Sequence, residues 1–121
     1  MRCFLCSLGV ALTNLITAAT ANTLLPHLKE GQSILYADQT LTASGWRPAP
    51  EDQAKPFEYA LAGNSLSSLA SCSGSGVGFC RYDYRLNNQK LVVVTIPASK
   101  PNHAGRVYRW WMEPLPVSQS H

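Results

Sequence analysis

The sequence of 121 residues is poor in charge, and its positive charges are scattered. Only 14% of the residues are charged, with ten Lys and Arg against seven Asp and Glu, and no two Lys or Arg residues are adjacent. Proteins that bind nucleic acid or anionic membranes usually carry clusters of basic residues. We therefore predict neither nucleic acid nor a membrane surface as a partner, while the net charge of +3 is compatible with an acidic protein.

The sequence also lacks the residue spacings that are typical of metal sites. Its three histidines, His27, His103 and His121, are far apart, and no two of them are four residues apart. Zinc sites usually take ligands from closely spaced pairs of His or Cys. We predict no bound metal, and no motif points to another cofactor.

Catalytic motifs are equally scarce. The loop Ser73-Gly74-Ser75-Gly76-Val77-Gly78 has no Gly-Lys-Ser/Thr ending and does not fit GxGxxG. Ser75 lacks the glycine two residues before it that a GxSxG nucleophile turn requires. Cys72 has no histidine in a pattern that would activate it. We predict that the protein is not an enzyme, and a small hydrolase using Ser75 or Cys72 is the weaker alternative.

The first residues have the composition of a secretory signal peptide. Arg2 precedes an apolar run from Cys3 to about Ala19, and small residues up to Ala21 match a cleavage site. Polar residues interrupt the run and no basic cluster follows it, which disfavours a retained membrane anchor. We predict cleavage of residues 1–21 near Ala21 and a periplasmic mature protein without a membrane span. Residues 22–116 would form a single domain, with a frayed tail at 117–121.

Removal of the signal peptide would leave two cysteines, Cys72 and Cys80. In an oxidising compartment, a lone pair of cysteines predicts a disulfide bond. Closing so short a loop should stabilise the domain by about 2.5 kcal/mol, because it restricts the unfolded chain.

Hydrophobic periodicity predicts one helix at residues 33–44. Ser33 is placed to cap its N-terminus, and Gly45 follows its last turn. The predicted apolar stripe consists of Ile34, Leu35, Ala37 and Leu41. Trp46 is expected to pack the end of the helix onto the core.

Antiparallel strands are expected to follow the helix. Residues 57–61 predict an edge strand, and residues 66–69 predict one turn of helix. Residues 79–86 and 91–96 alternate in polarity around Asn87-Asn88, which predicts a β-hairpin, and residues 106–112 predict a last strand. The fold class is therefore α+β, in two layers, with one N-terminal helix on a three- to four-stranded antiparallel sheet and one disulfide.

Alternation also assigns side chains to the two faces of the sheet. One face takes Cys80, Tyr82, Tyr84 and Leu86, with Leu91, Val93 and Thr95 beside them. In the last strand, the register decides which set points away from the helix: Tyr108, Trp110 and Met112, or Val107, Arg109 and Trp111. Arg and Trp on a solvated sheet face are typical of protein interfaces, although arginine stems also cover valines while their charges stay in water.

We predict that the sheet face pointing away from the helix, together with the loop from Ser73 to Gly78, binds a partner protein. The predicted contact residues are Arg81, Arg85, Arg109, Trp110, Trp111, Ser73, Gly74, Ser75 and Gly76.

Two motifs carry a resemblance to a protein group. They are Gly45-Trp46-Arg47-Pro48, and Cys72-Ser73-Gly74-Ser75-Gly76 followed by Cys80. With this pairing the sequence resembles small exported proteins of Gram-negative bacteria, most of them without an assigned function, over nearly all of the mature chain. The resemblance implies no catalytic residues. The expected layout is also similar to the repeats of β-lactamase inhibitor proteins and to small outer-membrane assembly lipoproteins.

Together these observations predict a non-enzymatic periplasmic protein that binds another protein. The specific hypothesis is an immunity or inhibitor protein that neutralises a toxin or hydrolase acting in the cell envelope. The alternative is a structural or assembly factor of the envelope, because the same layout occurs with different functions.

Overall fold

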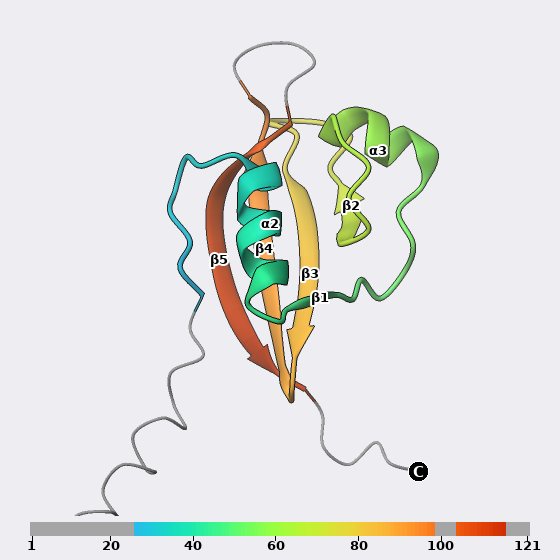
Figure 1. Cartoon of the computed structure of the whole chain (residues 1–121). Helices are drawn as coiled ribbons and strands as arrows, with labels where there is room; N and C mark the ends of the chain where they lie inside the picture. Colours follow the sequence, from blue (N-terminus) through green and yellow to red (C-terminus); the bar gives the residue numbers. More distant parts are fainter. Residues whose placement is uncertain (1–25, 99–103, 116–121) are drawn as a thin grey trace, which may run out of the picture.

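The computed structural model describes residues 26–98 and 104–115 (Figure 1). The predicted signal peptide at 1–21 and the predicted tail at 117–121 lie outside these residues. The elements in chain order are α2 (Ile34–Ala43), β1 (Arg47–Pro48), α3 (Pro56–Ala62), β2 (Leu69–Cys72), β3 (Cys80–Leu86), β4 (Gln89–Ile96) and β5 (Arg106–Pro114). The predicted α+β class is confirmed: α2 lies across one face of an antiparallel five-stranded sheet (Figure 1).

Helix α2 begins and ends where the sequence predicts. The Ser33 hydroxyl accepts a hydrogen bond from the Leu35 N–H at 3.1 Å, and Gly45 follows the helix with a φ of +100°. Ile34, Ala37 and Leu41 are buried against the sheet. Leu35 does not belong to this stripe, because successive residues are about 100° apart around a helix, and its side chain is 45% exposed. None of the helices in the described part of the chain is long and apolar enough to span a membrane.

The predicted edge strand at residues 57–61 is wrong, because these residues form helix α3. Pro56 occupies the first turn, where its missing N–H is not needed, and the Glu58 carboxylate accepts a hydrogen bond from the Lys55 N–H at 2.8 Å. Gly63 ends the helix with a φ of +75°. The predicted turn of helix at 66–69 is also wrong, since Leu69 begins strand β2.

The hairpin of β3 and β4 is the centre of the sheet. Leu86 pairs with Gln89 across the predicted two-residue turn, and Asn87 adopts a φ of +56°. Strand β5 pairs with the other edge of β4. The free edge of β3 is shared, because β1 pairs near Tyr84 and β2 pairs near Tyr82.

An extra residue in β5 interrupts the alternation of its side chains. Val107 pairs with Thr95 and Arg109 pairs with Val94, so Tyr108 has no partner in the ladder and forms a β-bulge. After the bulge, Trp110 pairs with Val93 and Met112 with Leu91, and both pack against the core. Neither predicted alternative for this strand is correct as a whole: the inner set is Val107, Trp110 and Met112.

Two buried tyrosines link the helices to β3. The Tyr84 hydroxyl donates to the Asp38 carboxylate of α2 at 2.7 Å and accepts from the Ser68 hydroxyl at 3.0 Å. The Tyr82 hydroxyl accepts from the Asn64 amide at 2.9 Å, just after α3. Burial raises the pKa of both tyrosines above the ordinary value, so both phenols stay neutral. This network satisfies polar groups inside the core and is structural.

The segment before α2 lies along the start of β5, and Figure 1 shows this trace beside the strand. The Gly31 N–H donates to the Val107 carbonyl at 2.7 Å, and the Val107 N–H donates to the Gln32 carbonyl at 2.8 Å. We call this segment, residues 26–32, the lead-in, and its Leu28 is buried. Gly105 lies so close to the end of β4 that a Cβ at this position would be 2.9 Å from the Ile96 carbonyl oxygen. Only glycine therefore fits without a shift.

Candidate functional site

We call the sheet face opposite α2 the outer face. Cross-strand pairs place its side chains in rows, because paired residues project to the same side. One row consists of Arg47, Arg85, Lys90 and Glu113. The next two consist of Asp83, Val92 and Trp111, and of Arg81, Val94 and Arg109. The last pair is Ile96 and Arg106.

Positive charge is concentrated on the outer face. Within residues 26–98 and 104–115, it carries six of the eight Lys and Arg residues but only two of the seven Asp and Glu residues. The six are Arg47, Arg81, Arg85, Lys90, Arg106 and Arg109. These residues come from four strands, and the sheet register brings them together although they are scattered in the sequence.

Asp83 forms salt bridges with two of these cations. Its carboxylate is almost fully buried and lies 2.8 Å from Arg81 Nε and 3.6 Å from Lys90 Nζ. The hydrogen bond from Arg81 to Asp83 raises the pKa of the guanidinium, which stays charged. The seven acidic residues all lie within residues 26–98 and 104–115, where Asp83 alone makes salt bridges. Four arginines of the outer face therefore have no carboxylate partner among the described residues: Arg47, Arg85, Arg106 and Arg109.

The aromatic hollow is a shallow depression on the same face, lined by Phe79, Val94, Tyr108, Arg109 and Trp111. Its volume is about 230 Å³, and its walls are almost entirely apolar. Phe79, Tyr108 and Trp111 are exposed by 38%, 37% and 37%, respectively. Pockets for small molecules usually measure roughly 300–1,000 Å³, so this hollow is the size of an inserted side chain rather than of a cofactor.

Contacts within the fold hold the rings of the aromatic hollow. The centroids of the Phe79 and Tyr108 rings are 5.5 Å apart, and the Arg109 guanidinium lies 5.4 Å from the centroid of Tyr108. The Trp111 indole N–H donates to the Glu113 carboxylate at 2.9 Å. The bulge explains the proximity of Tyr108 and Arg109, since it turns two successive side chains toward one face.

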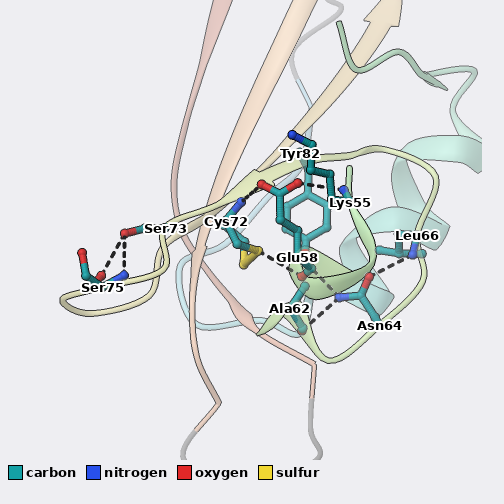
Figure 2. The surroundings of a disulfide bond; sticks show 10 residues. Lys55, Glu58, Ala62, Asn64, Leu66, Cys72, Ser73, Ser75 and Tyr82 are labelled. Atoms are coloured by element: carbon teal, nitrogen blue, oxygen red, sulfur yellow. Dashed lines mark hydrogen bonds between the residues drawn. A yellow bond between two sulfur atoms is a disulfide. The ribbon is translucent and has the colours of Figure 1, made fainter. Parts of the chain in front are cut away.

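The predicted disulfide between Cys72 and Cys80 is present, and it joins residues paired across β2 and β3. The Ser73 N–H donates to the Phe79 carbonyl at 2.7 Å and closes the loop beyond the disulfide. Figure 2 shows Ser73 and Ser75 on this loop, which projects away from Glu58 and α3. Because the loop ends at Phe79, it leads directly into the aromatic hollow.

The structure separates the residues predicted to bind a partner into three groups. Arg81, Arg85, Arg109 and Trp111 lie on the outer face. Trp110 lies on the inner face, half-buried against the core. Ser73, Gly74, Ser75 and Gly76 are exposed on the loop. Sequence reasoning missed Phe79, Val94 and Tyr108 as parts of one surface, because the bulge that places Tyr108 beside Arg109 leaves no trace in the alternation.

Two chemical alternatives can be compared with the geometry. Cys72 is bonded to Cys80, so its sulfur is not a free thiolate nucleophile in this structure. In the part of the chain that the structure describes, no three His, Cys, Asp or Glu side chains come together as a possible metal site.

No protein-family model, curated protein or solved structure matches the chain. The resemblance to small exported proteins therefore stays a prediction.

Glu58 links the disulfide to α3 and makes stability depend on pH. Its carboxylate accepts hydrogen bonds from the Lys55 N–H at 2.8 Å and the Cys72 N–H at 3.1 Å, both drawn in Figure 2. These backbone bonds lower the pKa of Glu58 below its ordinary value of 4.5. A carboxyl with a lowered pKa in the folded state stabilises the fold above the ordinary value, and this contribution disappears as the pH falls through the lowered pKa.

We therefore expect Glu58→Gln to lower the thermal midpoint at neutral pH and to flatten its decline below about pH 4.5. Thermal unfolding measured across pH 2–7 would check this, with the exposed Glu30→Gln as the matched control. Parallel pH profiles for the wild type and Glu58→Gln would contradict the assignment.

Proposed function

We propose that this protein is a non-enzymatic exported domain that binds another protein through its outer face, as an immunity or inhibitor protein. The observation that carries the proposal is the aromatic hollow, which exposes three aromatic side chains and an arginine side by side. Trp, Tyr and Arg are enriched among the residues that dominate binding energy at protein interfaces, and they cluster in central pockets. The charged rows around the hollow provide the polar rim of such an interface.

The rigidity of this surface supports the same role. The hollow is lined by residues of the hydrogen-bonded strands β4 and β5 and by Phe79, which is held next to the disulfide. A preorganised surface loses little conformational entropy on binding, which favours tight complexes. A tight complex is what an inhibitor needs to block its target.

The disulfide supports export as part of the proposal. Structural disulfides form and persist in oxidising compartments such as the bacterial periplasm and are rare in the cytosol. The leader-like composition of residues 1–21 agrees with that location. A target that acts in the envelope would meet the protein there.

The test is affinity capture from periplasmic extract with three baits: the wild type, Trp111→Ala and Tyr36→Ala. Tyr36 is the matched control, because it is an aromatic residue 60% exposed on α2, away from the outer face. We expect a stoichiometric partner on the wild type and on Tyr36→Ala. For Trp111→Ala we expect at least about 30-fold weaker binding, the loss typical of a central anchor.

Equal retention of the partner by Trp111→Ala, or no partner under any condition, would contradict the proposal. The inhibitor role also predicts a specific effect of deleting the gene. Deleting its gene should harm the cell only when the captured target is active, whereas deletion of an envelope assembly factor causes a general defect.

A further inference from the structure

We infer that the partner is an acidic protein surface, with an apolar side chain that enters the aromatic hollow and carboxylates that meet the arginines around it. This inference rests on the proposed protein-binding function and specifies the chemistry of the partner.

The outer face carries positive charge that no carboxylate among the described residues compensates. Arg81 and Lys90 already share Asp83, and Glu113 accepts the hydrogen bond of the Trp111 indole. Arg109 lines the hollow itself and is exposed, and Arg106 is exposed beside the bulge. Arg47 and Arg85 pair with each other across β1 and β3, so two like charges lie opposite each other with no benefit inside the fold. A partner with carboxylates at these positions would relieve that repulsion and complement the field.

The size and lining of the aromatic hollow favour an apolar side chain as its occupant. At about 230 Å³ with apolar walls, it accepts one or two apolar side chains. An apolar side chain would cover these apolar walls, whereas a charged group would lose part of its hydration against them. The partner must therefore offer an apolar residue at the centre and negative charge at the rim.

A second copy of this chain does not fit the description. Two outer faces placed together would each bring six cations and two carboxylates, and like charges would oppose one another.

Nucleic acid is the rival anion, because cations and aromatic rings also form surfaces for single strands. Those surfaces stack bases on open aromatic faces. Here the Phe79 ring lies 5.5 Å from the Tyr108 ring and the Arg109 guanidinium lies over Tyr108 at 5.4 Å, so these neighbours already occupy part of its stacking surface. The rings are arranged as walls of a hollow, which favours an inserted side chain over stacked bases.

The experiment is an NMR titration of the ¹⁵N-labelled protein with defined probes. The first probe is a short peptide with one phenylalanine between glutamates. Two matched peptides replace the glutamates by glutamines or the phenylalanine by alanine, and oligothymidylate represents nucleic acid. We expect the first peptide to shift the Trp111 indole and the Val94 and Arg109 amides, and each replacement to weaken binding by about tenfold.

Two variants test whether the response to the acidic peptide depends on a cation of the outer face. Arg109→Glu should abolish the response to the acidic peptide, whereas Lys29→Glu, an exposed cation of the lead-in, should leave it unchanged. Equal binding of the glutamine peptide, tighter binding of oligothymidylate, or no response on the outer face would overturn the inference. If the acidic peptide fails but a captured partner still depends on Trp111, the proposed function stands and only this inference is lost.

Discussion

Replacing Trp46 by alanine should lower the free energy of unfolding by about 3–5 kcal/mol, the range for truncating a buried aromatic residue. Trp46 is 3% exposed and belongs to the core cluster of α2 and the sheet. Its backbone N–H donates to the Leu41 carbonyl at 3.0 Å at the end of α2, and β1 begins at the next residue. The side chain is buried where the chain passes from helix to sheet, so its loss leaves a cavity at that junction.

Urea unfolding followed by far-ultraviolet circular dichroism would measure this effect without relying on tryptophan fluorescence. Since a small domain is stable by only about 5–15 kcal/mol, we expect a large shift of the midpoint. The control is Tyr36→Ala, which should change stability by no more than about 0.5 kcal/mol. A near-neutral Trp46→Ala would mean that this side chain does not pack in the core.

Replacing Cys72 by serine should lower the free energy of unfolding by about 2–4 kcal/mol. The disulfide closes a loop between residues separated by eight positions and joins β2 to β3 where they are already paired. Its removal increases the conformational freedom of the unfolded chain. It also releases the loop that holds Phe79 beside Tyr108. We therefore expect greater protease sensitivity at residues 73–79 as well as lower stability.

Comparison with a reductant provides the control for this variant. Wild-type protein unfolded in the presence of dithiothreitol should match Cys72→Ser, and the variant should not respond to the reductant. Coincident unfolding curves for the wild type and Cys72→Ser without reductant would show that the two cysteines are not bonded in solution.

The sequence predicted α2, the central hairpin and the disulfide because each depends on local chemistry. Ser33 and Gly45 mark the ends of the helix, and Asn87-Asn88 marks a two-residue turn. Helix α3 was missed although its signals were local too. Phe57, Tyr59 and Leu61 alternate as in a strand, but Pro56, Glu58 and Gly63 are helix start and stop signals. Phe57 and Leu61 are 56% and 51% exposed, so the alternation of apolar residues in this segment did not mark the buried face of a strand.

The candidate site was predicted only in part, because two of its properties depend on pairing between distant strands. The bulge at Tyr108 is a property of the β4–β5 register, and it decides that Trp111 faces outward while Trp110 packs inward. The clustering of cations likewise depends on register, which brings Arg47 beside Arg85 and Arg109 beside Val94. No count along a single sequence reveals either property.

The bonds between the lead-in and β5 have a consequence for how the chain reaches its fold. Gly31 and Gln32, which precede all the described helices and strands, are bonded to Val107 in β5, the last described strand. The β3–β4 hairpin needs only neighbouring residues, but the anchoring of the segment before α2 must wait for β5, and contacts between distant residues form slowly. A chain with this topology keeps this part of its fold open until β5 has been synthesised. That delay is the property a polypeptide needs if it is to be threaded through a translocation channel before it folds.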